Sequence, residues 1–196
     1  MLEVRYRTAR TRPLGHAAPL EAVGPGIQIQ PAGAEARFSL RTRQTAAPVA
    51  GLPLDGPMNS LRGDAGRWIA RLGPDEWLIG TAESEADPLA AAIGADLGGT
   101  AHALVDVSHR NVGIDVSGTH AAILLNAGCP LDLGDAAFPG GSATRTLLGK
   151  AEIVLIRWPG ATPRYRVECW RSFATYVHSF LVEAALGTGS APRSAA

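Results

Sequence analysis

The chain has 196 residues, of which 46% are hydrophobic and 18% are charged. This length can bury a hydrophobic core without disulfides or a metal, and this composition excludes general disorder. The 18 basic and 18 acidic residues balance to a formal net charge of +0, so we expect binding neither to nucleic acid nor to an anionic membrane surface.

The two cysteines, Cys129 and Cys169, form no CxxC motif and have no histidine at metal-ligand spacing. This pattern argues against a zinc site and against a secreted disulfide scaffold. Met1 is followed by charged and polar residues, and no apolar run has the length of a signal peptide or of a membrane span. We therefore expect a soluble, cytoplasmic protein.

Both ends of the chain are rich in small or helix-breaking residues. Residues 1–30 contain many Arg, Pro, Gly and Ala residues without sustained periodicity, which predicts an extended or flexible N-terminal arm that orders against a partner. Residues 187–196 predict a flexible tail. Residues 31–186 are expected to form the folded domain.

The first elements of this domain are predicted to be strands. Residues 36–41 alternate apolar and polar side chains, which indicates a half-buried strand. Residues 51–66 contain several Gly, Pro, Asn and Asp residues and predict a loop. The turn Gly73-Pro74-Asp75 then predicts a hairpin between strands 68–72 and 76–80.

Helices and strands alternate in the middle of the chain. Residues 88–97 predict a short Ala-rich helix that begins near a proline. Residues 103–107 and 112–116 predict two strands joined by Ser108-His109-Arg110-Asn111. Residues 119–127 predict a second helix, which ends before a glycine and a proline.

The last third of the chain is also predicted to contain strands followed by a helix. Strands are predicted over 144–148 and 152–158, on either side of Gly149-Lys150. A strand over 164–170 places two sets of side chains on opposite faces: Tyr165, Val167 and Cys169 on one, and Arg164, Arg166 and Glu168 on the other. Residues 172–186 predict a closing helix with one apolar stripe, capped by Ser172 and ended by Gly187. The stripe consists of Phe173, Tyr176, Val177, Phe180, Leu181 and Ala184.

Short helices between mostly hairpin-connected strands indicate the α+β class, with helices packed on mostly antiparallel sheets. We expect two ferredoxin-like halves, at about 31–100 and 101–186.

The usual catalytic motifs for dinucleotide, NTP, zinc-protease or serine-hydrolase chemistry are missing. Asp106, Ser108 and His109 have the residue types of a catalytic triad. Side chains so close in sequence rarely point at each other on a strand. We interpret Ser108 and His109 as groups that cap a strand end.

Large aromatic and charged side chains complete the set of candidates. The four tryptophans, Trp68, Trp77, Trp158 and Trp170, lie in or beside predicted strands, which favours core packing or an interface anchor over ligand stacking. Arg145 has the geometry to bind a carboxylate, and a structural ion pair is the favoured interpretation. The residues by themselves therefore indicate a globular α+β domain without a visible active site.

Three segments carry a resemblance to a known family. They are LGPDEWL at residues 72–78, ALVDVSHR at 103–110, and a third block that runs from GCPLDL at 128–133 through Phe138 to RTLLGKAEI at 145–153, continued by ECWRSF at 168–173. In this order and spacing they resemble the gamma subunits of heterotetrameric sarcosine oxidase. The resemblance spans residues 67–186, whereas residues 1–66 match loosely.

The resemblance implies a fold and an assembly. The family is similar to the tetrahydrofolate-binding aminomethyltransferase of the glycine cleavage system, including the Val116-Ser117-Gly118 segment, so an aminomethyltransferase-like, folate-binding-like fold is expected. Alpha, beta, gamma and delta subunits together would oxidise sarcosine to glycine, form hydrogen peroxide and pass a one-carbon unit to tetrahydrofolate. FAD, FMN, NAD, zinc and tetrahydrofolate are expected on the other subunits, and no cofactor on this chain.

The resemblance also assigns residues. An aspartate that acts on folate in the aminomethyltransferases corresponds to Glu152, where a longer carboxylate near Lys150 is expected to be ion-paired rather than free for proton transfer. Glu152 and Arg145 are the folate-site candidates, and no catalytic or metal-binding residue is expected. The candidates for structural or interface roles are Trp77, Asp106, Ser108, His109, Lys150 and Trp170.

The expected role is therefore assembly and enclosure of the oxidase. One alternative is a free-standing folate-binding aminomethyltransferase-like protein. Another is the gamma subunit of a related N-methyl amine oxidase. A scaffold unconnected to an oxidase is disfavoured by the three ordered segments.

Overall fold

A computed structural model describes residues 13–15, 26–44 and 47–187. The strands are β1 Gln28–Pro31, β2 Glu35–Thr42, β3 Ser60–Gly63, β4 Arg67–Gly73, β5 Glu76–Ala82, β6 His102–Asp106, β7 Asn111–Ser117, β8 Ser142–Leu148, β9 Ala151–Arg157 and β10 Arg164–Trp170. The helices are α1 Ala86–Leu97, α2 Ala121–Asn126 and α3 Ala174–Gly187, and the 3₁₀ turns η3 Glu83–Glu85 and η4 Arg171–Phe173 precede α1 and α3. This content confirms the predicted α+β class.

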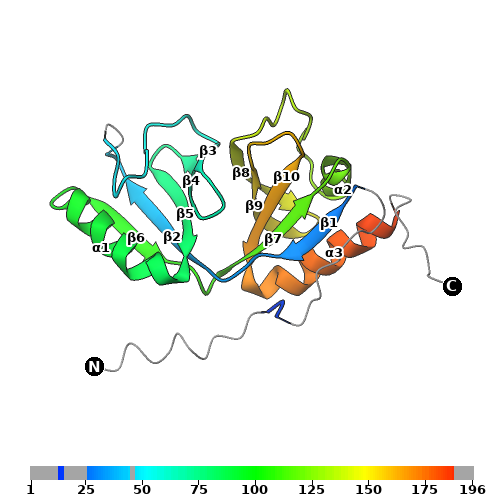
Figure 1. The fold of residues 1–196 in the computed structure, drawn as a ribbon, viewed down its shortest axis with the longest axis horizontal. Helices are drawn as coiled ribbons and strands as arrows, with labels where there is room; N and C mark the ends of the chain where they lie inside the picture. The colour runs from blue at the N-terminus through cyan, green and yellow to red at the C-terminus, as the bar shows by residue number, and fades with distance from the viewer. Residues whose placement is uncertain (1–12, 16–25, 45–46, 188–196) are drawn as a thin grey trace.

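The strands form one sheet in the order β1-β7-β10-β9-β8-β3-β4-β5-β2-β6, and neighbouring strands are antiparallel. A single register pair, Ser60 with Ser142, joins β3 to β8 at the centre. We call β3-β4-β5-β2-β6 the first half and β1-β7-β10-β9-β8 the second half (Figure 1).

The two halves exchange their outermost strands. β1 lies in the second half, although the chain continues from it into β2 of the first half. In the same way β6 lies in the first half and leads into β7 of the second. Along the chain, β1–β5 are followed by η3 and α1, and β6–β10 are followed by η4 and α3. The fold is therefore an internal repeat of two units, and the first strand of each unit pairs in the sheet half formed by the other unit.

The two predicted ferredoxin-like halves are not confirmed. A ferredoxin-like unit alternates two helices with four strands in the order β-α-β-β-α-β, whereas β2, β3, β4 and β5 follow one another without a helix. A division near residue 100 also separates β6 from the half to which it is paired, because β6 hydrogen-bonds to β2.

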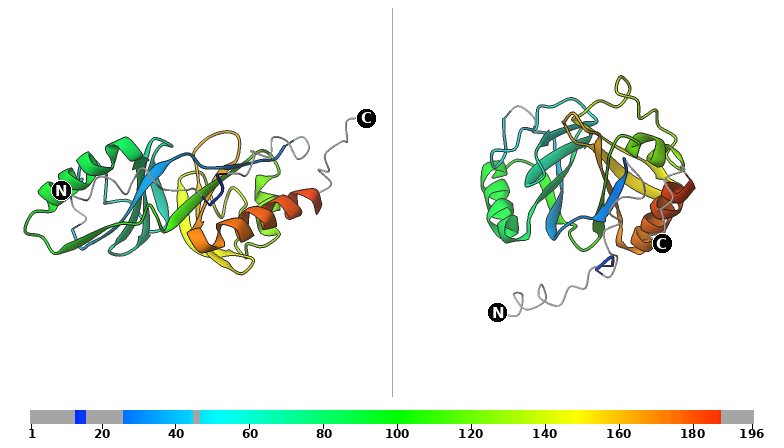
Figure 2. Two further views of the ribbon diagram at one scale, coloured as in Figure 1. Left: turned by 90° about the horizontal axis from the view of Figure 1, so that it is seen from below. Right: turned by 45° about the vertical axis from the view of Figure 1, so that its right-hand side comes forward.

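Helices cover the outer face of each half, with α1 on the first and α2 and α3 on the second (Figures 1 and 2). Helix α1 buries Leu89, Ile93 and Leu97, each four residues after the last, against the core of the first half. Each fully buried side chain contributes about 1.5–3 kcal/mol. A third core lies on the inner faces between the halves and contains Leu61, Trp68, Ala70, Leu78, Val107, Ala143, Val154, Ile156 and Trp158.

The hairpin predicted around Gly73-Pro74-Asp75 is confirmed as β4 and β5. The Arg71 guanidinium stabilises its turn by donating to the carbonyl oxygens of Gly73 and Pro74, and it also reaches the carbonyl of Gly56 at 2.6 Å. The predicted loop over residues 51–66 is partly wrong, because β3 lies within it and pairs with β4.

The ends of the chain also depart from expectation. Strand β1 begins at Gln28, inside the segment predicted to be an arm, and its Ile29 is fully buried. Leu14 and Ile27 of the predicted arm are also buried. Arm residues 1–12 and 16–25 and tail residues 188–196 lie outside the described residues. Helix α3 begins at Ala174 rather than Ser172 because η4 precedes it, and Tyr176 of the predicted stripe is exposed.

No helix within the described ranges combines the length and the apolar character needed to cross a membrane.

Candidate functional site

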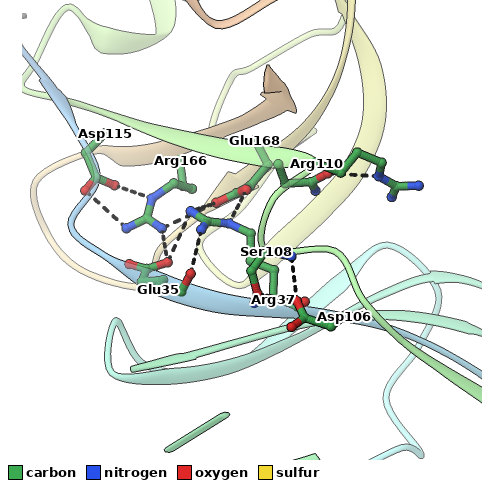
Figure 3. A network of polar contacts seen from close by, with 9 residues as sticks. Glu35, Arg37, Asp106, Ser108, Arg110, Asp115, Arg166 and Glu168 are labelled. Atoms are coloured by element: carbon green, nitrogen blue, oxygen red, sulfur yellow. Dashed lines mark hydrogen bonds and ion pairs between the residues drawn. The ribbon is translucent and has the colours of Figure 1, made fainter. Parts of the chain in front are cut away.

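Five charged side chains meet on the inner face of the sheet, where β2 passes between the halves. Glu35 and Arg37 come from β2, Asp115 from β7, and Arg166 and Glu168 from β10. We call these five residues the ionic network (Figure 3). Strand alternation produces it, because Arg166 and Glu168 point away from the α3 side of β10.

The ionic network is closely bonded. Arg37 binds Glu168 with two hydrogen bonds, from Nε to Oε2 at 2.6 Å and from Nη2 to Oε1 at 2.9 Å. Arg166 binds Asp115 in the same two-pronged way, at 2.7 and 3.2 Å, and its Nη1 lies 2.8 Å from Glu35 Oε2. These contacts connect a strand of the first half to two strands of the second.

Burial makes these pairs sensitive to the loss of a partner. The Glu168 side chain is fully buried, and those of Arg37 and Arg166 are nearly so. Burial alone would lower the pKa of Arg166, but Asp115, Glu168 and Glu35 raise it overall. Burial also acts to lower the pKa of Arg37, but the charges of Glu168 and Glu35 and the hydrogen bond to Glu168 raise it overall. Both arginines therefore stay charged, and removing one partner leaves an uncompensated buried charge.

A cleft of about 200 Å³ lies beside the ionic network, between the inner faces of the two halves. Ser39, Arg41, Leu72, Glu76, Trp77 and Leu78 line it from the first half. Arg110, Asn111, Arg145, Glu152, Ile153, Val154, Glu168 and Trp170 line it from the second half and from the connection that leads into it. The cleft is therefore a contact zone between the two halves.

The charged groups inside the cleft are mostly paired with one another. Arg145 binds both carboxylate oxygens of Glu76, with Nη1 to Oε2 at 2.8 Å and a second bond from Nη2 to Oε1. Arg41 lies 3.1 Å from the same carboxylate and 3.2 Å from Asp75. The hydrogen bond from Arg145 is the main cause that lowers the pKa of Glu76, so this carboxylate is held ionised and is a poor proton acceptor.

The predicted ion pair of Arg145 is thus confirmed, and its partner is Glu76. The structure also places Glu152 and Trp170 in the same cleft. Glu152 is exposed, and its carboxylate lies 4.0 Å from Arg145 Nε. Glu152 therefore has an ion-pair partner, as expected, but this partner is Arg145, and no ion pair joins Glu152 to Lys150 among the described residues.

Asp106 and Ser108 form a local turn rather than part of a triad. The Asp106 carboxylate accepts hydrogen bonds from the backbone N–H of Ser108 at 2.9 Å and from its hydroxyl at 2.5 Å. The Ser108 hydroxyl oxygen also accepts the backbone N–H of Arg37 at 2.9 Å, so the group caps the end of β6 against β2. His109 is exposed on this connection.

Trp77, Lys150 and Cys169 have structural positions. Trp77 is buried in the core beneath α1, with the Arg71 guanidinium 5.3 Å from its ring centroid. Lys150 is exposed in the turn between β8 and β9, where its backbone N–H donates to the Tyr176 hydroxyl at 3.0 Å. Burial, followed by the charge of Glu168, raises the pKa of Cys169 to about 12, so this thiol is not a nucleophile at neutral pH.

Sequence reasoning did not identify the ionic network. Alternation had placed Arg166 and Glu168 on the polar face of a strand, and a polar face usually predicts exposure. The signal that could have indicated burial is Gly113, which has no side chain where β7 crosses this face. A Cβ atom there would lie 2.7 Å from Glu168 Oε1 and 2.8 Å from Arg37 Nη2.

The size and the side chains of the cleft bear on whether it could hold one of the groups that an oxidase of this kind uses. The described ranges contain no group of three or more His, Cys, Asp or Glu side chains that could hold a metal. The cleft is smaller than the roughly 300–1,000 Å³ of sites that enclose drug-sized ligands. The cleft is therefore too small to enclose a whole folate or flavin within this chain. Both oxygens of the Glu76 carboxylate in this cleft are bound by Arg145.

Comparison with known proteins gives a consistent result. The family model for the sarcosine oxidase gamma subunit matches residues 31–187. A sarcosine oxidase subunit gamma from Corynebacterium sp. strain U-96 is 29% identical over 141 residues, which cover 70% of this chain and 66% of that relative, slightly less than two thirds of its length. The protein of the same name from Corynebacterium sp. strain P-1 is 30% identical over 178 residues, covering 91% of this chain and 73% of the relative.

Two solved structures share the fold. One is a chain of the heterotetrameric sarcosine oxidase from Corynebacterium sp. U-96 in complex with pyrrole 2-carboxylate, with a TM-score of 0.77, 24% identity and coverage of 95% of this chain and 99% of that chain. The other is the glycine cleavage system aminomethyltransferase T from Bartonella henselae, with a TM-score of 0.65, 12% identity and coverage of 86% of this chain and 48% of that chain. At these identities, the likeness shows the fold alone.

Proposed function

Because the chain belongs to the sarcosine oxidase gamma subunit family, we propose that it is the gamma subunit of a heterotetrameric sarcosine oxidase. Its role is to assemble and enclose the complex. The alpha, beta and delta subunits supply the oxidation of sarcosine to glycine, the formation of hydrogen peroxide and the transfer of a one-carbon unit to tetrahydrofolate.

The observation that carries this proposal is the extent of the match. The family model covers nearly all of the folded domain, and the fold superposes on 99% of a chain that forms part of such an oxidase. By contrast, the chain spans 48% of the aminomethyltransferase that shares its fold. A subunit of a larger assembly therefore suits this chain better than a free-standing aminomethyltransferase.

The side chains of the cleft support a non-catalytic role. A general base must reach its substrate and have a pKa suited to proton transfer, whereas Glu76 is bound on both oxygens by Arg145. Glu168 is enclosed by Arg37 in the ionic network. We place FAD, FMN, NAD, zinc and tetrahydrofolate on the other subunits and derive no reaction step from this chain.

Co-expression with the alpha, beta and delta subunits tests the proposal. We would purify through a tag on this chain, record the absorption spectrum and assay hydrogen peroxide formed from sarcosine. We expect a flavin spectrum and sarcosine-dependent peroxide in the tagged fraction. A colourless chain purified without the other subunits would contradict the proposal, and binding of tetrahydrofolate by that lone chain would favour the free-standing folate protein.

A further inference from the structure

The opening of the cleft combines large apolar side chains with arginines. Trp170 is 46% exposed, and Leu147 is 49% exposed. Leu147 lies opposite Glu152 in the register of β8 and β9, on the same face. Arg41, Arg110 and Arg145 line the same cleft as Trp170. We call Arg41, Arg110, Arg145, Leu147 and Trp170 the cleft mouth.

Charge is distributed unevenly with depth in this cleft. The Arg41 and Arg145 side chains are 54% and 42% exposed, whereas that of their shared partner Glu76 is 10% exposed. Glu168 is buried beneath them and bound to Arg37. Glu152 is an exposed carboxylate in the cleft, and Asp75 lies beside Arg41. The side chains of Glu152 and Asp75 are thus about as exposed as those of Arg41 and Arg145, whereas Glu76 and Glu168 are buried and bound to arginines.

Of the three arginines that line the cleft, Arg110 has terminal nitrogens without an acceptor among the described residues. Its Nε donates to the side-chain oxygen of the neighbouring Asn111 at 3.2 Å. Its two terminal nitrogens have no acceptor among the described residues, and its guanidinium points away from the ionic network (Figure 3). An exposed guanidinium with a free pair of donors suits a carboxylate, which it can bind with two parallel hydrogen bonds.

We propose that the cleft mouth is the docking surface for an acidic segment of another subunit of the oxidase. A carboxylate of that segment pairs with Arg110, and an apolar neighbour covers Trp170 and Leu147. The cleft has room for the side chains of a short segment, and tryptophan with arginine is the composition found at the energetic centre of protein interfaces. The two terminal nitrogens of Arg110, which bind no acceptor among the described residues, favour an acidic partner over a basic one. This inference rests on the proposed function.

The test measures how well variants of this chain stay in the complex. Each variant is co-expressed with the alpha, beta and delta subunits and purified through a tag on the alpha subunit. The amount of this chain per flavin is then measured after dilution. We expect Arg110→Glu and Trp170→Ala each to lower the retained fraction by about fivefold or more, because loss of a central anchor raises the dissociation rate. Arg110→Lys should lie between wild type and Arg110→Glu.

Matched controls change the same residue types elsewhere. Arg62→Glu alters an exposed arginine of β3, and Ile123→Ala truncates an exposed apolar side chain of α2. Both should be retained as well as the wild type. Thermal unfolding of each variant, recorded in the complex, shows that the fold is intact.

The outcomes separate the two claims. Retention of both Arg110→Glu and Trp170→Ala at the wild-type level would overturn the docking surface and leave the proposed function standing. A wild-type chain absent from the purified oxidase would overturn the proposed function and this inference with it.

Discussion

One added methyl group tests how tightly the ionic network is packed. A Cβ atom at Gly113 would lie 2.7 Å from Glu168 Oε1, 2.8 Å from Arg37 Nη2 and 2.9 Å from Arg166 Cδ. We predict that Gly113→Ala lowers the free energy of unfolding by about 1–3 kcal/mol, because buried charged groups must shift to admit it. Denaturant unfolding gives the value.

Gly94 provides the control for that substitution. It lies inside α1, and a Cβ atom there would meet no heavy atom within 4 Å. Gly94→Ala should raise the free energy of unfolding by about 0.5–1 kcal/mol through helix propensity. Equal effects of the two substitutions would contradict the packing described at Gly113.

Neutralising Glu168 tests the electrostatics of the same residues. Glu168→Gln keeps the shape of the side chain but leaves Arg37 without its main counter-charge. We predict a loss of about 3–5 kcal/mol in the free energy of unfolding, as for other buried pairs deprived of one partner. Asp75→Asn, in the exposed pair with Arg41, should cost less than about 1 kcal/mol. A small effect at Glu168 would indicate that water reaches the ionic network.

The Glu76–Arg145 pair predicts an acid dependence of stability. The pKa of Glu76 is lower in the folded chain than its ordinary value of 4.5, chiefly because Arg145 donates a hydrogen bond to it. The stabilisation is therefore present above pH 4.5 and is lost as the pH falls through the folded pKa. Urea unfolding from about pH 6 to about pH 3 should show wild type and Glu76→Gln converging in stability toward acid. A constant difference would contradict the assignment.

Secondary-structure elements were predictable where local patterns decide them. The hairpin at Gly73-Pro74-Asp75 and the alternation of residues 164–170 are confirmed because turn chemistry and two-residue periodicity act over a few residues. β3 was missed because its four residues include Gly63 and lie in a segment rich in loop-forming residues. Burial of Arg166 was missed because β2, far away in sequence, supplies Glu35 and Arg37.

The exchange of β1 and β6 between the halves had no local signal. Residues 28–31 form a short strand that ends in a proline, and their pairing partner β7 lies about 90 residues later. We predict that Ile29→Ala costs about 2–5 kcal/mol in the free energy of unfolding, because this side chain is fully buried in the core of the second half. Thermal or denaturant unfolding measures it.

The neighbouring glutamines serve as the control for β1. Gln28 and Gln30 are exposed on the same strand, so Gln30→Ala should change the free energy of unfolding by less than about 0.5 kcal/mol. If Ile29→Ala were equally mild, β1 would be a loosely attached arm rather than a strand of the second half.

At the level of the whole molecule, the outer and inner faces of the sheet differ in what covers them. The outer faces are covered by helices and apolar cores. The inner faces hold the ionic network, which fixes the two halves to each other, and the cleft, whose ion pairs leave Arg110 and Trp170 accessible. The inner side of the described residues is therefore a partly charged surface on which the carboxylates of Glu76 and Glu168 are bound to arginines.

Native mass spectrometry of the co-expressed oxidase tests this account most directly. The chain would be produced with the alpha, beta and delta subunits, and the intact mass of the purified complex would be measured together with the masses of its dissociated chains. The account predicts a particle that contains one copy of this chain and one copy of each of three different subunits. A particle of those three subunits without this chain, or this chain alone in solution, would contradict it.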